Sequence, residues 1–353
     1  MRNSERFVAL DGLRGVFAIA VVLHHYSQLQ GGHLMRSAWL AVDAFFILSG
    51  FVIALSYTHR ILEGLSFFEF FKIRLLRLYP MYFMGLLLGV AALWAYGPSN
   101  LSLTPDVFKM LFVGIFSVPY FGSFPWESGN LLNQAVVFPF NDPAWSLFFE
   151  IFANILFFVT ARIFFIGRRS VVILMLLLLL CYVISINVWG LHSGYSQNNF
   201  WGGFARVVFH FSLGCCIFKM QKVKVDFHRR WIYILLVVAL LIFNVGNVFI
   251  ICSMLLFVAP LIVFVGSKTA IASNTFEARL LTWLGGISFP LYITHYPLYR
   301  LWEPIMSSMV ERGAVSLFLS TLLSVLVAHF LMLLEPRVRV ILSTCLTTKK
   351  LVR

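Results

Sequence analysis

The sequence predicts an all-α, polytopic membrane protein with about ten transmembrane helices and with both termini in the cytosol. Of its 353 residues 60% are hydrophobic, the mean hydropathy is +0.90 and only 12% are charged, whereas roughly a quarter of the residues of a soluble domain are charged. Apolar runs long enough to cross a bilayer recur along the whole chain. No hydrophilic stretch is long enough for a second domain, so we expect a single transmembrane domain over residues 1–340 and a short basic cytosolic tail over 341–353.

Ten apolar stretches have the length and composition of membrane spans. They lie near residues 15–33, 38–58, 79–97, 144–164, 170–190, 203–219, 231–247, 248–266, 281–302 and 314–335. No small-residue cleavage pattern follows the first stretch, so we expect it to stay in the protein rather than to be removed as a signal peptide. We find no internal repeat among the ten.

A weaker apolar run at 107–122 is assigned by the distribution of positive charge. With ten crossings and a cytosolic N-terminus, all but five of the 27 lysines and arginines lie on the cytosolic side, as the positive-inside rule expects. A further crossing at 107–122 would move Arg168, Arg169 and the basic cluster at 219–230 to the outside. We therefore expect 107–122 to be re-entrant or to lie on the outer face. The net charge of +13 then reflects topology, and we expect no nucleic-acid partner.

The five cysteines show no C-x-x-C spacing, and most of them lie in apolar runs. A free thiol in such a run behaves as a small hydrophobic group. We expect neither a disulfide nor a zinc site, and no other metal site.

The first span contains ionisable side chains in the stretch DGLRGVFAIAVVLHHYS, residues 11–27. Such groups are costly inside a membrane and are therefore candidates for function. Eleven residues of helix turn through about 1100°, so Arg14 and His25 share one face, about 16 Å apart along the axis. A neutral histidine can act as a general base or can simply bond a neighbouring helix, and the alignment with Arg14 favours function. His24 points about 100° away and is interpreted as structural.

Two further stretches place polar groups in the second span and just before the third. In the second span, Asp43 lies toward the outer end, and Ser49 lies at a depth like that of His25. Ser49 and the adjacent Gly50 form either a polar notch beside the histidine or a small-residue packing site. The stretch FKIRLLRLYP at 71–80 places Arg74 and Arg77 one turn apart. They serve either as ordinary topology signals or as a site for a phosphate group, which arginine binds through two parallel hydrogen bonds.

The fourth and ninth spans also carry polar groups. Trp145 is expected at the outer interface, and Ser146 and Glu150 face the same way, one turn apart. Glu150 could orient a histidine, hold a sugar hydroxyl, or form a structural ion pair with an arginine such as Arg206. His295 lies between two prolines of the ninth span, so it could act directly or could satisfy backbone carbonyls that the prolines leave free.

Five stretches together resemble the integral-membrane acyltransferase-3 family, which includes O-acetyltransferases of bacterial surface polysaccharides. They are ALDGLRG with a histidine eleven residues after its arginine, VDAFFILSGFVI, RLLRLYP, PAWSLFFEIF and SFPLYITHYPL, in family order over nearly the whole chain. Each is weak alone, but all five in order are specific. Some relatives carry an additional extracytoplasmic hydrolase-like domain, and this chain ends soon after its tenth span.

The resemblance implies a membrane O-acyltransferase of the bacterial inner membrane. Its donor would be a cytosolic acyl-CoA, often acetyl-CoA, as a co-substrate and without a bound cofactor. Its acceptor would be a hydroxyl of a cell-envelope carbohydrate or glycolipid. By position, His25 matches the catalytic histidine and Arg14 its partner. Arg74 and Arg77 match the cytosolic arginines, and Trp145, Ser146 and Glu150 match the later motif.

We therefore expect three sets of site residues. The catalytic set is His25, Arg14 and Glu150; the acyl-CoA-binding set is Arg74, Arg77 and Arg14; the acceptor or pocket set is Asp43, Ser49, Trp145, Ser146 and His295. The main alternative is a transporter or flippase for an acyl or sugar-linked lipid, which makes no bond, and a non-catalytic scaffold is a third hypothesis. The paired Arg74 and Arg77 favour the enzyme, because a transporter binds its ligand near mid-membrane.

Overall fold

The computed structural model describes residues 7–96, 105–122, 136–166, 168–222, 230–242, 247–269, 271–272 and 274–348. Within these ranges the chain folds into helices without a β-strand, apart from one isolated β-bridge between Val136 and Ser196. The helical class predicted from the sequence is confirmed.

The helices follow one another with short connections over most of the described chain. They are α1 (Val8–Leu29), α2 (Leu40–Leu62), α3 (Phe67–Tyr96), α4 (Pro105–Ile115), α5 (Ala144–Ile166), α6 (Arg168–Trp189), α7 (Gly202–Lys219), α8 (Arg230–Ile242), α9 (Val248–Ser253), α10 (Ala259–Lys268), α11 (Phe276–Met309) and α12 (Ala314–Thr348). A short 3-10 turn (Met220–Lys222) follows α7, and a π-helical segment (Met254–Val258) joins α9 to α10.

Seven helical segments of the described chain are long and apolar enough to cross a membrane. They are Val8–Leu29, Leu40–Leu62, Phe67–Tyr96, Ala144–Arg162, Ser170–Trp189, Val248–Lys268 and Ala314–Thr344. The other three predicted spans correspond to α7, α8 and α11, which are helical in their described parts but do not reach this length and hydropathy. A multi-pass membrane protein is therefore supported, while the number ten and the cytosolic position of both termini stay predictions.

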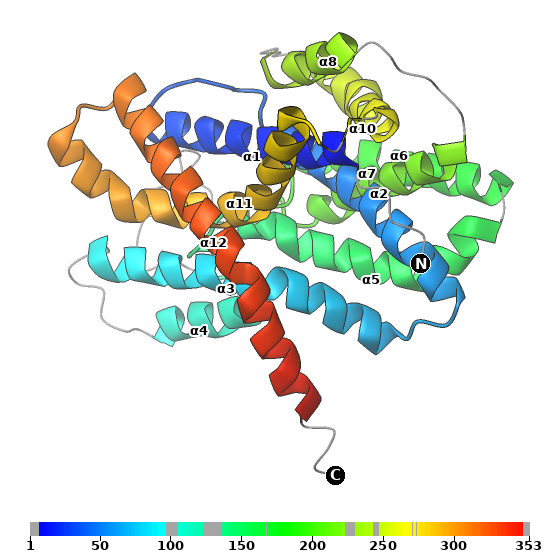
Figure 1. The fold of residues 1–353 in the computed structure, drawn as a ribbon, viewed down its shortest axis with the longest axis horizontal. Helices are drawn as coiled ribbons and strands as arrows, with labels where there is room; N and C mark the ends of the chain where they lie inside the picture. Colours follow the sequence, from blue (N-terminus) through cyan, green and yellow to red (C-terminus); the bar gives the residue numbers. More distant parts are fainter. Residues whose placement is uncertain are drawn as a thin grey trace.

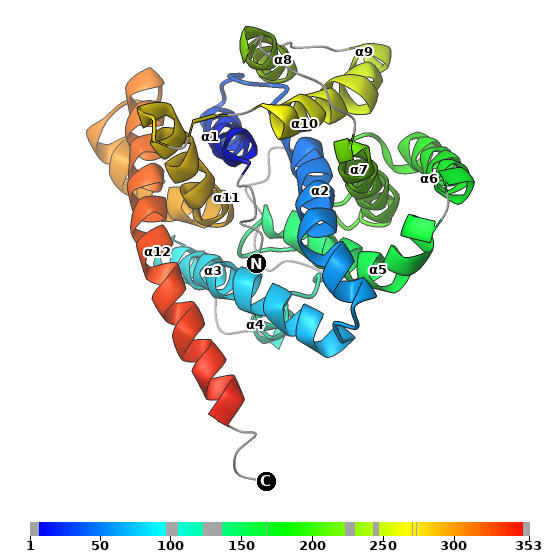
Figure 2. The ribbon, with the colours of Figure 1, turned by 45° about the vertical axis from the view of Figure 1, so that its right-hand side comes forward.

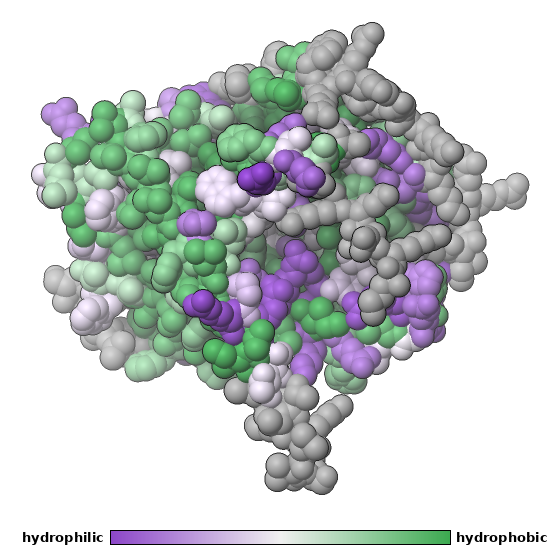
Figure 3. Space-filling view, in the orientation of Figure 1, coloured by the Kyte–Doolittle hydropathy of each residue, from purple (hydrophilic) through white to green (hydrophobic). Residues whose placement is uncertain are grey.

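The helices form a bundle in which α12 crosses α3 obliquely (Figure 1). The C-terminal part of α12 extends beyond the other helices, which is also seen in Figure 2. The most extensive contacts join α1 to α11 and α2 to α7, and α11 also packs on α3 and α12. Figure 3 shows an apolar surface over the left part of this face, with hydrophilic groups near the middle and toward the right.

The contact between α2 and α7 depends on two glycines. A Cβ atom at Gly50 would overlap the carbonyl oxygen of Phe211, and one at Gly214 would overlap that of Ile47. The two backbones therefore touch directly, as small residues allow in membrane helix pairs. Of the two interpretations of the region around Ser49, close packing accounts for Gly50.

The predicted 107–122 segment turns back along α3. The Tyr79 hydroxyl donates to the carbonyl of Ile115 over 2.7 Å, and the Tyr82 hydroxyl donates to that of Gly114. The last carbonyls of a helix lack intrahelical partners, and inside a bilayer they must find partners within the protein. Both tyrosines lie within the third predicted span, so the end of α4 packs on that span. Whether 107–122 is re-entrant or lies on the outer face stays a prediction.

The proline-rich helix α11 is stabilised by a side chain that lies outside it in the sequence. Pro297 has no N–H, so the carbonyl of Ile293 lacks its usual helical partner. The Asn141 side chain donates to that carbonyl over 2.7 Å. The carbonyl that Pro297 leaves free is thus satisfied by Asn141, and His295 is not needed for it.

Candidate active site

A cavity of about 320 Å³ lies among α1, α2, α3, α5, α11 and α12. Its charged lining consists of Arg14, Arg74, Arg77, Glu150, Glu335 and Arg339. We call this the charged end. The wall supplied by α2 from Val42 to Ile53 is mostly apolar, and the end opposite the arginines reaches Phe45, Ser146 and Tyr292.

Glu150 connects three helices at the charged end. Its Oε1 accepts a hydrogen bond from Arg74 over 3.0 Å and another from the Ser49 hydroxyl over 2.9 Å. Arg74 is only 5% exposed, and a buried cation of this kind requires a counter-charge. The ion pair of Glu150 is therefore with Arg74 and not with Arg206, the example that we considered from the sequence.

The remaining arginines of the charged end differ in their partners. Arg14 forms an ion pair with Asp11, and Arg339 forms one with Glu335, four residues earlier on α12. Arg77 is exposed, and no ion pair to it is found in the described part of the chain. Arg77 is thus the arginine of the predicted Arg74–Arg77 pair that keeps its guanidinium available at the cavity.

Sequence reasoning missed Glu335, Arg339 and Tyr292 as cavity residues. Glu335 is the last residue of the tenth predicted span, and Arg339 follows that span, where the sequence indicates only a positive charge on the cytosolic side. Both side chains line the cavity, and α12, which carries them, crosses the bundle obliquely (Figure 1). The signal in the sequence was a Glu–Arg pair with i, i+4 spacing, which does not reveal what it faces.

His25 lies outside the cavity lining and contacts a second histidine. Its Nδ1 is 2.8 Å from Nε2 of His295, and the two ring planes are within 6° of parallel with their centroids 5.2 Å apart. The structure thus joins two residues that are 270 positions apart. Arg14, on the same helix α1, lines the cavity. Its predicted partner His25 lies eleven residues further along α1 and does not line it.

Tyr292 connects the cavity to this histidine pair. Its hydroxyl is 2.8 Å from the Ser146 hydroxyl at the cavity wall. Its backbone carbonyl is 2.8 Å from Nδ1 of His295. At this end of the cavity, Tyr292 is therefore the residue that lies between the cavity and the His25–His295 pair.

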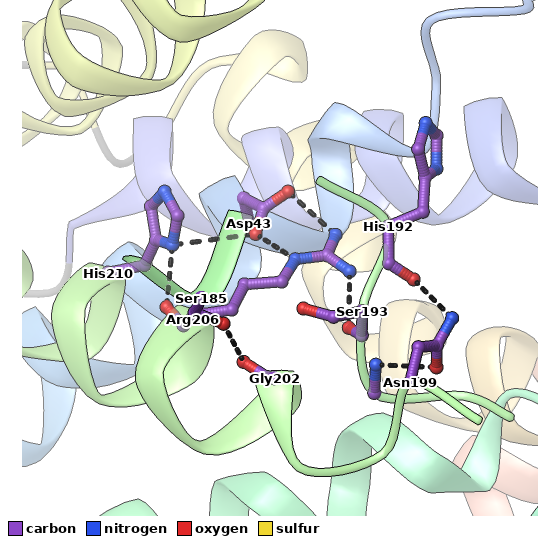
Figure 4. Close-up of polar contacts among 9 residues, drawn as sticks. Asp43, Ser185, His192, Ser193, Asn199, Gly202, Arg206 and His210 are labelled. Carbon is purple, nitrogen blue, oxygen red and sulfur yellow. Dashed lines mark hydrogen bonds and ion pairs between the residues drawn. The ribbon is translucent and has the colours of Figure 1, made fainter. Parts of the chain in front are cut away.

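Asp43 and Trp145 do not line the cavity and lie in a separate buried network around Arg206. Figure 4 shows Asp43, Arg206 and His210 of this network. Arg206 donates to both carboxylate oxygens of Asp43, over 2.7 and 2.8 Å, and to the carbonyl of Ser193 over 2.9 Å. His210 donates from Nδ1 to the carbonyl of Arg206 over 2.7 Å. The indole of Trp145 lies 5.4 Å from the guanidinium. The Asp43–Arg206 ion pair, with the bond from Arg206 to the Ser193 carbonyl, holds α2, α7 and the loop before α7 together.

No group of three or more histidine, cysteine, aspartate or glutamate side chains is placed to hold a metal ion within the described ranges. The site consists of arginines, carboxylates, hydroxyls and two histidines. Such groups can bind an anion, take up a proton and polarise a carbonyl group.

The chain matches the family described as "Acyltransferase domain" over residues 7–333. A match over nearly the whole length shows that the protein belongs to this integral-membrane acyltransferase family, as its five sequence motifs indicated.

Two relatives are similar over parts of the chain. "Protein 2 in picA locus" of Rhizobium radiobacter is 37% identical over 161 residues, which are 43% of this chain and 81% of that protein. "Putative membrane-bound transacylase BcsY" of Komagataeibacter xylinus is 26% identical over 218 residues, 61% of this chain and 52% of that protein. The match therefore spans about half the length of the transacylase. No solved structure matches the chain.

Proposed function

We propose that the protein is a membrane O-acyltransferase that moves an acyl group, with acetyl as the first candidate, from cytosolic acyl-CoA to a hydroxyl of a cell-envelope carbohydrate or glycolipid. The observation that carries this proposal is a single cavity with arginines at one end and, at the other, the tyrosine that contacts the His25–His295 pair. Membership of the acyltransferase family supports the class of reaction. We place the reaction at the bacterial inner membrane.

The arginines would bind the phosphate groups of the donor at the charged end. Arg77, Arg14 and Arg339 can each offer several N–H donors to phosphate oxygens. Arg74 is occupied by Glu150, so in this proposal it shapes the pocket more than it binds phosphate. The arm that carries the thioester would follow the apolar wall of α2 toward Tyr292.

The chemistry would take place at His25. In the direct route, its imidazole removes the proton from the acceptor hydroxyl, the oxygen attacks the thioester carbonyl and forms the ester, and the C–S bond breaks. The imidazolium then returns the proton to the CoA thiolate. In the two-step route, the imidazole nitrogen itself attacks the thioester, the C–S bond breaks and CoA leaves as the thiolate. The acceptor hydroxyl then attacks the acyl-imidazole, the C–N bond breaks, and the hydroxyl proton passes to the thiolate. Both routes use the same histidine.

The acceptor would enter from the outer side. Ser146 and Ser49 line the cavity and offer hydroxyl groups to an incoming sugar. Asp43 and Trp145 contribute by holding the Arg206 network that forms the adjacent outer wall. In this proposal they act on the acceptor path indirectly.

The test is transfer and hydrolysis of radiolabelled acetyl-CoA by the purified full chain in detergent. His25→Ala is compared with His329→Ala, a control histidine that accepts a hydrogen bond from Trp283 and does not line the cavity. We expect wild type and the control to consume acetyl-CoA, and His25→Ala to bind CoA without turnover. Failure of wild type with acetyl-CoA and with a series of other acyl-CoAs would overturn the proposal and favour a transporter.

A further inference from the structure

The contacts of His295 determine which of its two ring nitrogens carries a proton. Nδ1 of His295 lies 2.8 Å from the carbonyl oxygen of Tyr292 and 3.1 Å from that of Leu291. A carbonyl oxygen can only accept a hydrogen bond, so Nδ1 of His295 must carry the proton. In a neutral imidazole the other nitrogen then has a lone pair and no hydrogen. Nε2 of His295 is therefore an acceptor.

The same reasoning extends to His25. Its Nδ1 is 2.8 Å from Nε2 of His295. Because that nitrogen accepts, Nδ1 of His25 must donate and must carry the proton. The lone pair of neutral His25 is then on Nε2, the nitrogen that does not face His295. The contacts of His295 Nδ1 with the two carbonyls and the bond between the two rings thus fix the tautomers of both neutral histidines.

We infer that His295 is a positioning residue that holds His25 in the Nδ1–H tautomer, so that Nε2 of His25 is the nitrogen that takes up the proton or the acyl group. This inference rests on the proposed function for its catalytic meaning. It assigns distinct roles to the two histidines: His295 cannot be the base, because its Nδ1 is bound to carbonyls and its Nε2 to His25.

His295 is rigidly held for this task. The residue has no exposed surface, and its own carbonyl accepts a hydrogen bond from the Tyr26 hydroxyl over 2.7 Å. That hydroxyl is also 2.6 Å from the Ser324 hydroxyl of α12. Helices α1, α11 and α12 therefore fix both the ring and the backbone of His295. A group that only filled space between helices would not need this set of bonds.

The arrangement also gives the reacting histidine an uncharged partner. In the serine protease triad, a carboxylate accepts the Nδ1–H of the histidine and holds its tautomer. Here a neutral imidazole takes that place. When Nε2 of His25 receives the proton of the acceptor hydroxyl, the Nδ1–H bond to His295 strengthens, because its donor has become charged. The proton then leaves from Nε2 to the thiolate, and His295 neither gains nor loses one.

The inference can be tested without any assay of activity. The full chain is labelled with ¹⁵N-histidine, and the tautomer of each ring is determined by NMR in detergent micelles. The protein has nine histidines, and the signal that disappears in His25→Gln identifies His25. We expect the His25 proton on Nδ1 in wild type and a shift toward Nε2–H in His295→Ala. A wild-type His25 with its proton on Nε2, or a tautomer that His295→Ala leaves unchanged, would overturn the inference.

Kinetics test the catalytic meaning separately. We expect His295→Ala to lower kcat by about 10- to 100-fold, part of the 10²–10⁴-fold that a positioned base contributes, with the KM for the donor nearly unchanged. His295→Gln should recover part of the loss, since its amide oxygen can accept the Nδ1–H of His25. His329→Ala should match wild type. An unchanged kcat in His295→Ala would overturn the positioning role and leave the acyltransferase proposal intact. An inactive wild type would overturn the acyltransferase proposal, and the NMR result would still decide the tautomers.

Discussion

Arg74 of α3 and Glu150 of α5 form a 3.0 Å ion pair at the wall of the cavity, and only 6% of the Arg74 side chain and 24% of the Glu150 side chain are exposed. The carboxylate therefore has two roles: it compensates a buried cation and it shapes the charged end. Any variant that removes the carboxylate also leaves the buried Arg74 guanidinium without its counter-charge.

We expect Glu150→Gln to destabilise the protein by about 1–3 kcal/mol, because it leaves the Arg74 guanidinium buried beside a neutral amide. The apparent unfolding temperature in detergent measures this. Asp106→Asn is the matched control, since its ion pair with Lys109 is exposed and contributes little. The double variant Arg74→Leu/Glu150→Leu should be more stable than Glu150→Leu alone, and the opposite order would contradict a buried, charge-compensating pair.

Arg77 and Arg339 are expected to bind the phosphates of the donor. Replacing either by alanine should weaken CoA binding by about 10-fold or more, the loss expected for a charge-assisted hydrogen bond. Isothermal titration with CoA and with dephospho-CoA measures the effect. Replacing an arginine that binds the 3′-phosphate should abolish the preference of the protein for CoA over dephospho-CoA. Replacing an arginine that binds the diphosphate should lower the affinity for both ligands equally.

The control for these two variants is Arg312→Ala. Arg312 is exposed and pairs with Glu303, and neither residue lines the cavity. We expect it to bind CoA as wild type does. If Arg77→Ala and Arg339→Ala also bind CoA normally, the charged end does not hold the donor phosphates.

The helical class and the family could be predicted because both depend on local sequence. Apolar runs of span length report burial in lipid directly, and the five motifs lie within continuous segments. The same local signals identified the stretches that contain Arg14, Arg74 and Glu150, all of which line one cavity. The sequence could not show that a cavity joins them.

Pairings between distant residues could not be predicted, because the sequence offers several possible partners for a buried charge such as Asp43 or Glu150. Which partner is chosen depends on how the helices pack. Asp43 and Glu150 were both isolated carboxylates in the sequence, and only the packing of α2 on α7 assigns Arg206 to Asp43. The His25–His295 contact likewise depends on how α1 packs against α11. Arg339 was missed because it reaches the cavity through the packing of α12 on α1, α3 and α11, which the sequence of α12 alone does not show.

Asn141 and Pro297 offer a test of how α11 is stabilised. The Asn141 amide bonds the Ile293 carbonyl, which lacks a helical partner because of Pro297. Asn141→Leu should destabilise the protein by about 1–3 kcal/mol through an unsatisfied buried carbonyl. In the background of Pro297→Ala the backbone N–H returns, so the same substitution should cost less. The apparent unfolding temperatures of the four proteins form a double-mutant cycle, and strictly additive effects would show that the two residues do not share this carbonyl.

Asp142, which precedes the span at Ala144–Arg162, gives the stability a pH dependence of defined sign. Its Oδ1 is buried without a hydrogen-bond partner, and burial raises the pKa of this carboxyl to about 7 although the charge of Arg300 lowers it. An unfolded aspartate ionises near pH 3.9. Between pH 4 and 7 the folded state therefore holds a proton that the unfolded state has lost, so stability falls as the pH rises.

Asp142→Asn removes this titration. Relative to wild type, we expect little change near pH 4 and a gain of about 1–4 kcal/mol at pH 8, where the wild-type carboxylate is charged and buried. Unfolding temperatures of both proteins, measured from pH 4 to pH 8 in one detergent, give the difference curve. The predicted curve rises with pH and levels off above pH 7. A difference that is constant, or that grows toward low pH, would mean that the folded carboxyl is not held protonated at this position.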